Sequence, residues 1–182
     1  DRLYEKAKRA QWNVSDDLDW STDVDPERLI RLQAEESGIP PGYPARALAE
    51  MDNSPVASWT DDQWVEFAVH SQCASLSQFL HGEQGALLVA ARLVEAVPAI
   101  DAKYYGATQV VDEARHVEAF SRYLDEKMPV TYPINENLRS LLNEVLRDSR
   151  WDVVFLGMQV VIEGLALAAF GFMMGTTRDP LL

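Results

Sequence analysis

The pattern of apolar and polar positions changes at Thr60, and from there onward apolar residues recur every three or four positions. This spacing is typical of α-helices that bury one face. Thr60 and Gln63 have the spacing of a capping box, which marks the start of a helix. Because the next proline is Pro98, the pattern predicts one helix of about 37 residues in this stretch.

Two more helices with clear boundaries are predicted after this proline. The second is expected to run from an N-cap at Asp101 to about Lys127. The third is expected to run from an N-cap at Asn135 to about Arg147.

A fourth helix is predicted over an almost entirely apolar stretch, and Ser149 and Asp152 have the spacing of its start signal. The sequence from Thr60 onward contains no convincing strand pattern. The expected fold class is therefore all-α, a bundle of long antiparallel helices.

The first part of the chain has a different, mixed pattern. Residues 1–59 are expected to form an arm that wraps the bundle of residues 60–182, not a separate domain. Short helices are predicted near residues 2–10, 26–37 and 44–51, separated by an acidic loop at 13–25 and a proline-rich loop at 38–44.

Composition and charge exclude several functions. The net charge of -13 argues against nucleic acid as a partner, because phosphates and an acidic surface repel each other. The single cysteine, Cys73, excludes an internal disulfide and a cysteine-based zinc site. The charged opening residues lack a signal-peptide pattern, so a cytoplasmic location is expected.

The apolar stretch at residues 153–174 is long enough to span a membrane. However, Gln159 and Glu163 lie near its middle, where lipid offers no partner, and no Lys/Arg cluster flanks it. We therefore expect a helix buried in the protein core and no membrane contact.

Three glutamates occupy inward positions in the predicted apolar stripes, one on each of three helices. Three carboxylates brought together without a cation would repel each other strongly, so Glu83, Glu113 and Glu163 indicate a metal site. The alternatives are a protonated or salt-bridged Glu163 in the core and a Glu83 at a wet helix boundary. The three stripes are Leu76, Leu80, Glu83, Leu87, Ala90 and Val94; Gln109, Glu113, His116, Phe120 and Leu124; and Leu156, Val160, Glu163, Leu167 and Phe170.

Glu113 and His116 form a Glu-x-x-His pair. Their side chains are expected about 60° apart on one helix face, close enough to share a metal ion. About one shuffled chain in four of this composition contains such a pair, so the motif alone is weak evidence. Its position, between inward-facing glutamates on two other helices, makes it more specific.

The order of these residues resembles the ferritin-like di-iron carboxylate pattern, in which a Glu is followed by Glu-x-x-His and then by a Glu on a later helix. The segment "DEARH" looks much like the corresponding segment of di-iron oxygenases and of the radical-generating subunit of ribonucleotide reductase. The resemblance covers roughly residues 60–182. It implies a ferritin-like bundle that binds two iron ions, or a manganese and an iron ion.

The same resemblance implies a role for particular residues. Glu83, Glu113, His116 and Glu163 would be metal ligands. Asp112 would hydrogen-bond a ligand histidine on another helix, with Arg115 as its structural neighbour.

The complete pattern has a second Glu-x-x-His, and we expect it to lie beyond Leu182. His70 and His81 are not substitutes, because both are rotated by about 200° or more from the direction of Glu83. Asp179 and Pro180 resemble the start of a further helix, which also suggests a longer chain.

The resemblance implies an O₂-activating oxygenase or oxidase that acts on a small organic substrate, with an electron-donor protein and a homodimer as possible partners. Two other functions stay open: iron oxidation and storage, and radical generation. A radical generator usually has a tyrosine four residues after the ligand histidine, and this chain has Phe120 there. A bundle without metal that serves only as a scaffold is the remaining alternative.

Overall fold

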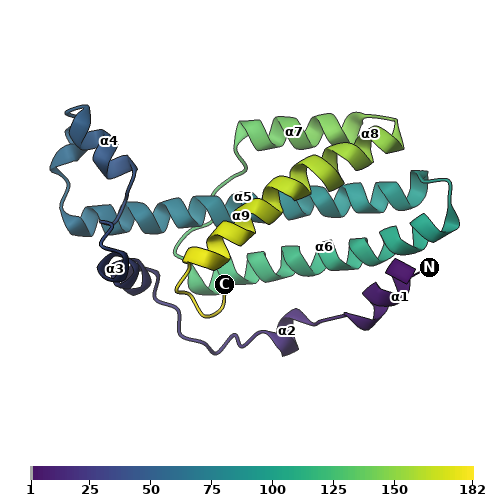
Figure 1. Ribbon diagram of the computed structural model, residues 1–182, viewed down its shortest axis with the longest axis horizontal. Coiled ribbons are helices and arrows are strands. Elements are labelled where there is room, and N and C mark those ends of the chain that lie inside the picture. The colour runs from purple at the N-terminus through teal and green to yellow at the C-terminus, as the bar shows by residue number, and fades with distance from the viewer. Residues whose placement is uncertain (1) are drawn as a thin grey trace.

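Every regular element among residues 2–182 of the computed structural model is a helix, and this range contains no strand. Two long helices form the frame (Figure 1). Helix α5 spans Asp61–Ala96 and α6 spans Ile100–Lys127, and the two pack along their length. The chain reverses direction between them, so α6 runs back alongside α5.

The remaining helices cover this pair on two sides. Helix α7 (Glu136–Arg147) packs against α5, and it is followed by α8 (Trp151–Phe155), a π-helical segment η2 (Leu156–Ile162) and α9 (Glu163–Thr176). These last three join end to end, and α9 crosses α5 in Figure 1. The all-helical bundle predicted from the sequence is confirmed.

The N-terminal arm lies against both long helices. Helices α1 (Arg2–Arg9) and α2 (Val14–Asp17) contact α6, and α3 (Pro26–Ser37) contacts α5. Helix α4 (Ala45–Met51) and the short helix η1 (Pro55–Ser58) complete the arm before α5 begins. The helix α2 falls within the segment predicted as an acidic loop, because the Asn13 side chain accepts a hydrogen bond from the Ser15 amide and starts a turn.

Several predicted caps are present. Thr60 and Gln63 form both hydrogen bonds of the capping box at the start of α5. Asn135 accepts a hydrogen bond from the Leu138 amide at the start of α7. Gly38 ends α3 with a positive φ of 68°, a conformation that glycine adopts without strain.

Two predicted starts are wrong. Helix α6 has Ala99 as its N-cap, so Asp101 is the second residue of the helix. Its negative charge stabilises the first turn there. The N-cap of helix α8 is Arg150, not Ser149, and no side chain caps this helix. Asp148, just before it, accepts hydrogen bonds from the backbone and side chain of Arg150. Asp179 accepts a hydrogen bond from the Leu181 amide, as an N-cap does, and Pro180 lies in a bend, so the helix start expected there stays a prediction.

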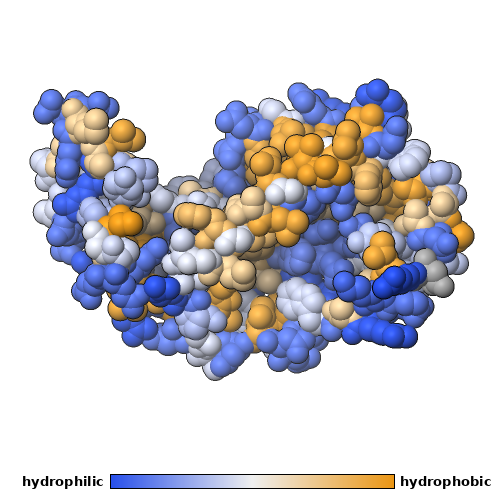
Figure 2. Space-filling model, in the orientation of Figure 1, coloured by the Kyte–Doolittle hydropathy of each residue, from blue (hydrophilic) through white to orange (hydrophobic). Residues whose placement is uncertain are grey.

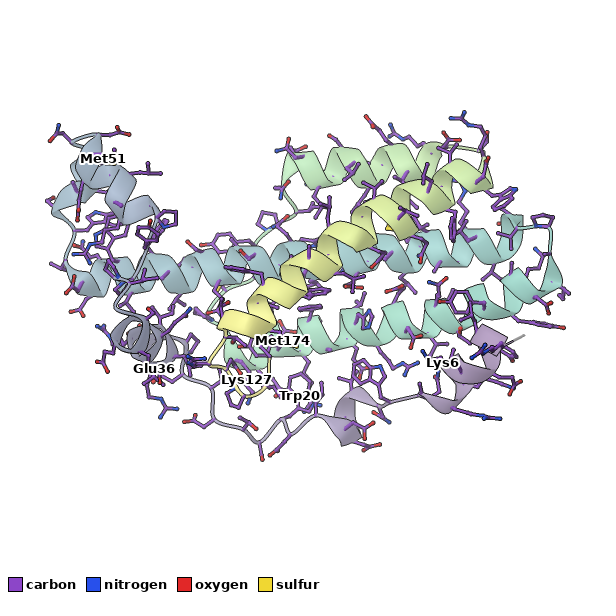
Figure 3. The ribbon with its side chains drawn as sticks, viewed as in Figure 1. Lys6, Trp20, Glu36, Met51, Lys127 and Met174 are labelled. Atoms are coloured by element: carbon purple, nitrogen blue, oxygen red, sulfur yellow. The ribbon has the colours of Figure 1, made fainter. Side chains whose placement is uncertain are left out.

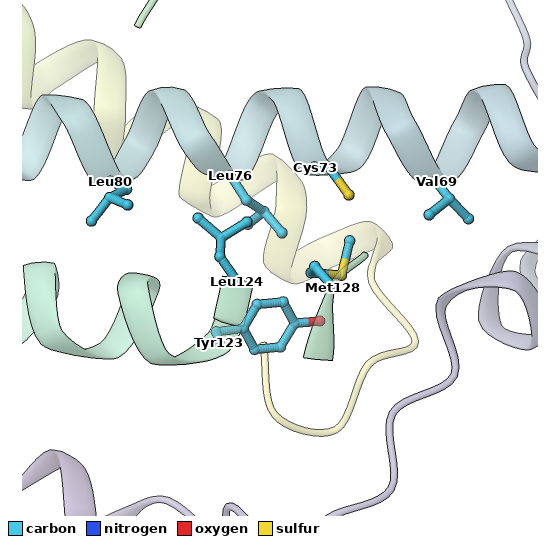
Figure 4. Packing of buried hydrophobic residues seen from close by; sticks show 7 residues of the cluster. All are labelled: Val69, Cys73, Leu76, Leu80, Tyr123, Leu124 and Met128. Carbon is cyan, nitrogen blue, oxygen red and sulfur yellow. The ribbon is translucent and has the colours of Figure 1, made fainter. Parts of the chain in front are cut away.

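Two apolar clusters hold the helices of the bundle together. The first joins residues of α5 to the end of α6, and Figure 4 shows Leu76 directed at Leu124 with Tyr123 beside it. The second joins the following part of α5 to α7, α8 and η2 through Leu142, Val154 and Met158. The clusters meet along α5 between Leu80 and Ala86, and Glu83 lies in this interval. The carboxylate of Glu83 therefore lies between the two apolar clusters.

The apolar helix α8–η2–α9 is more exposed than the sequence predicts. Leu156, Val160 and Leu167, expected to face the core, are 55%, 54% and 71% exposed. Figure 2 shows hydrophobic patches along this helix. By length and composition Trp151–Thr176 would be able to cross a membrane, which by itself is weak evidence for a span. The prediction of a buried helix is wrong for this face.

The π-helical segment explains why the predicted stripe fails before Glu163. A π-turn holds about one residue more than an α-turn, so it shifts every later position around the helix axis. Val154 and Met158 are buried, and Ile162 packs on the same cluster, so the inward stripe before Glu163 runs through these three residues. The stripe predicted with uniform α-helical spacing placed Leu156 and Val160 there instead.

Candidate metal centre

Glu83 of α5 meets Glu113 and His116 of α6 in the space between the two long helices. The Nδ1 atom of His116 lies 3.1 Å from Oε2 of Glu83 and 3.2 Å from Oε2 of Glu113. One ligand atom from each residue lies within 4.8 Å of those of the other two. Both glutamates are 6% exposed. The structure thus brings together three of the four ligands predicted from the sequence.

Helix geometry explains this arrangement. Glu113 and His116 are three residues apart on α6, so their side chains project from one face towards α5. The exposed Glu118 on the same helix and Glu95 at the end of α5 project to solvent, as the sequence predicts. The buried glutamates are therefore distinguished by their helical position.

The three groups shift one another's protonation. Contacts with the carboxylates of Glu113 and Glu83 raise the pKa of His116 to about 10. Burial raises the pKa of Glu113, and the neighbouring Glu83 carboxylate raises it further, although His116 acts in the opposite direction. Two buried carboxylates this close together would stabilise a bound cation.

Charge compensation inside the protein is incomplete. Among the described residues, His116 is the one basic side chain in an ion pair with Glu83 or Glu113. A single imidazole N–H can donate one well-directed hydrogen bond, so one of the two carboxylates is left with a poor partner. Carboxylate oxygens and an imidazole nitrogen are ligands that suit Fe²⁺ and Mn²⁺. The donor set therefore fits a divalent metal ion.

Glu163 is the first residue of α9 and is partly buried. Burial raises its pKa to about 7, and the charges of Glu113 and Glu83 contribute to the same shift. Glu163 thus shares an electrostatic environment with the other two glutamates. It lies outside the group of three whose ligand atoms are within 4.8 Å of one another.

Asp112 and Arg115 connect the site to the N-terminal arm. Nη2 of Arg115 donates to Asp112 at 2.7 Å and to the side chain of Gln11 at 2.7 Å, while Nη1 donates to the carbonyl of Trp12 at 2.9 Å. The Trp12 ring lies 6.3 Å from the imidazole of His116, measured between ring centroids. The hydrogen bond predicted from Asp112 to a ligand histidine stays a prediction.

Gln11 and Trp12 were not found from the sequence. Nothing in their spacing relates them to a helix that begins about 90 residues later. A buried arginine next to a predicted ligand was the available signal, because its N–H groups need more acceptors than its own helix supplies. The arm provides those acceptors.

The other two histidines are used elsewhere. Nδ1 of His70 lies 2.7 Å from the hydroxyl of Tyr132, and Nε2 of His81 lies 3.0 Å from the carbonyl of the same residue. Both anchor the loop before α7 to α5. As predicted, neither joins the group of Glu83, Glu113 and His116.

The π-helical segment also contacts α6 near the site. Nε2 of Gln109, a member of the predicted inward stripe, donates to Oε1 of Gln159 at 2.7 Å. The side-chain nitrogen of Gln159 is buried with no hydrogen-bond partner among the described residues. A π-turn that redirects polar side chains inward is common next to functional sites.

Comparisons of the chain with models of protein families, with curated proteins and with solved structures found no match. The functional argument therefore depends on the residues and geometry described above.

Proposed function

We propose that the chain carries an O₂-activating di-iron centre, within a ferritin-like bundle, and acts as an oxygenase or oxidase of a small organic molecule. The observation that carries the proposal is the buried group of Glu83, Glu113 and His116, whose ligand atoms lie within 4.8 Å of one another. Two of its three members are carboxylates with little exposure and incomplete charge compensation.

The proposed ligands have distinct tasks. Glu83, Glu113 and His116 would hold the metal between α5 and α6, whereas Glu163 from α9 would add a third carboxylate. Bound ferrous iron would supply the electrons that make O₂ reactive towards an organic molecule. The apolar clusters on either side of Glu83 help to keep bulk water away from the two buried carboxylates, those of Glu83 and Glu113.

Two ferrous ions carry more positive charge than three glutamates compensate. A fourth carboxylate and a second imidazole would balance the charge and complete the coordination. In this proposal they come from a second Glu-x-x-His outside residues 1–182.

A radical-generating function is supported less well. Phe120 occupies the position where a tyrosine is expected, and Tyr123, one helical turn further on, donates its hydroxyl hydrogen bond to Asp179 in a buried contact. An iron-storage function has no support from a polar iron path, because the cavity next to Glu83 is lined mainly by apolar side chains.

The test is to load the protein with Fe²⁺ without oxygen and then expose it to O₂, following O₂ consumption and iron bound per chain. The proposal predicts rapid O₂ consumption with about two irons per chain in a protein that includes the predicted second Glu-x-x-His. Continued uptake of many irons per chain would favour storage instead. A stable tyrosyl radical signal in electron paramagnetic resonance would favour radical generation.

A further inference from the structure

An apolar cavity of about 500 Å³ opens beside the candidate metal centre. This volume is within the range of small-molecule sites. Its walls come from the arm, α5, α6, α9 and the residues that follow α9. Figure 3 shows Trp20 of the arm and Met174 of α9 near the same end of α6, where Lys127 is labelled. Six of the lining residues are Leu18, Trp20, Ala119, Phe120, Leu167 and Phe170.

The cavity reaches the proposed metal ligands. Glu83 and His116 are part of its lining. The Glu83 side chain is 7% exposed, whereas the His116 side chain is 42% exposed, so the imidazole is the larger polar surface that faces the cavity. A molecule bound there would lie against the same residues that are proposed to hold the metal.

The charges around the cavity exclude anionic ligands. Among the described residues that line it, none is Lys or Arg, and Glu83 contributes a carboxylate. Tyr123 also lines the cavity, but its hydroxyl hydrogen is donated to Asp179. The imidazole of His116 is already paired with the carboxylates of Glu83 and Glu113, so an anion would lose its hydration and face that negative pair, which is unfavourable. An uncharged molecule avoids this cost.

Aromatic side chains form one wall. The rings of Phe120 and Phe170 are stacked with centroids 6.0 Å apart, and Phe79 packs behind Phe170 at 4.8 Å. Trp20 and Tyr123 bring the aromatic residues of the lining to four. Rings of this kind attract another ring beyond what buried area alone provides, through offset-stacked and edge-to-face contacts. The thioethers of Met173 and Met174 also line the cavity and make favourable contacts with aromatic groups.

We propose that this cavity is the substrate site and that it takes an uncharged aromatic molecule. As a substrate assignment this rests on the proposed function, while binding itself needs no metal. Arm, α6 and α9 must all be in place, because each supplies part of the wall.

Glycine 171 provides a sharp test. Gly171 lines the cavity, and a Cβ added at this position meets no atom within 4 Å. A leucine there would fill part of the cavity without a backbone clash. Gly175→Leu is the matched control, since Gly175 lies on the same helix, also has open space around it and does not line the cavity.

The experiment measures binding to the metal-free full chain by calorimetry or ligand-observed NMR, with benzyl alcohol as the uncharged aromatic probe. Cyclohexylmethanol tests the preference for an aromatic ring, and benzoate tests the exclusion of anions. We expect benzyl alcohol to bind more tightly than either, Gly171→Leu to weaken its binding about tenfold or more, and Gly175→Leu to leave it unchanged. Thermal unfolding of both variants shows that they are folded.

Binding of benzoate or cyclohexylmethanol as tight as that of benzyl alcohol would overturn the proposal. So would equal binding of benzyl alcohol to the wild type and Gly171→Leu, or no binding to the wild type. A failure of the metal proposal alone gives a different result. In that case the chain would bind benzyl alcohol but would take up no iron.

Discussion

The carboxylates of Glu83 and Glu113 both lie within hydrogen-bond distance of one nitrogen of His116. This shared contact determines how stable the site is without metal. Two buried carboxylates and one imidazole cannot all be well paired, so the empty arrangement costs free energy that a bound cation recovers. Function and stability should therefore respond to mutation in opposite directions at these positions.

The first prediction concerns Glu113→Gln. An amide of nearly the same shape removes one buried negative charge, so we expect the metal-free protein to be stabilised by about 1 kcal/mol. The same variant should lose the increase in melting temperature that Fe²⁺ or Mn²⁺ gives to the wild type. Thermal unfolding with and without metal measures both effects.

Glu118→Gln is the matched control, because Glu118 lies on the same helix and is exposed. It should change neither quantity. A destabilised metal-free Glu113→Gln that keeps its metal response would contradict the proposed role of Glu113.

The second prediction concerns pH. The pKa of Glu163 is raised to about 7 by burial, so its ionised form is disfavoured in the folded protein, and stability is lost as the pH rises from the usual pKa of a glutamate to about 7. The pKa of His116 is raised to about 10, so the stability that its proton contributes is complete below its ordinary value near 6.5 and is lost as the pH rises to about 10. Both shifts make the metal-free protein less stable as the pH increases.

Urea unfolding between about pH 5 and about pH 8 tests this sign. We expect the free energy of unfolding to fall over this interval, and to fall by about 1 to 3 kcal/mol less in Glu163→Gln. Glu95→Gln, an exposed substitution, should follow the wild type. A wild-type stability that rises with pH here would show that Glu163 and His116 are not in the charged environment described.

At the scale of elements, the long helices were predictable because their boundaries are encoded locally. The capping box at Thr60, the cap at Asn135 and the glycine at the end of α3 are all used as the sequence indicates. Glu83, Glu113 and His116 were found for the same reason: α5 and α6 keep regular α-helical spacing throughout the site.

The parts that failed depend on tertiary contacts. The π-turn of η2 shifts the face of the last helix, and no local sequence rule for α-helices contains that shift. The contact of Arg115 with Gln11 and Trp12 joins segments about 100 residues apart. Pattern reading compares neighbours along one helix, so it does not detect such a contact.

A third prediction tests that contact. Arg115→Leu removes the hydrogen bonds to Gln11 and to the Trp12 carbonyl, which should destabilise the fold by about 1 to 3 kcal/mol. We expect faster hydrogen exchange in residues 2–12 while α5 stays protected. Arg139→Leu, at an exposed position of α7, is the control. Unchanged exchange in the arm of Arg115→Leu would mean that Arg115 does not hold it.

At the scale of the molecule, the α8–η2–α9 helix presents apolar side chains to solvent beside an otherwise acidic surface. Leu165 and Phe172 are 66% and 75% exposed, and neither lines the cavity. Contiguous apolar surface of this kind promotes association.

The fourth prediction is that this chain associates with itself as its concentration rises. The double substitution Leu165→Lys with Phe172→Lys should shift it towards the 20.5 kDa monomer in sedimentation velocity. The same double substitution should leave the binding of benzyl alcohol unchanged. A wild type that stays monomeric at every concentration would show that this face does not drive association.

The most direct test of the central claim is an anaerobic titration of the metal-free protein with Fe²⁺, in which calorimetry measures the binding. The account predicts saturable binding to the chain of residues 1–182, at least tenfold weaker in Glu83→Gln and in Glu113→Gln, and unchanged in Glu118→Gln. Binding that is equally tight in all four proteins, or absent from the wild type, would contradict a metal centre formed by Glu83, Glu113 and His116.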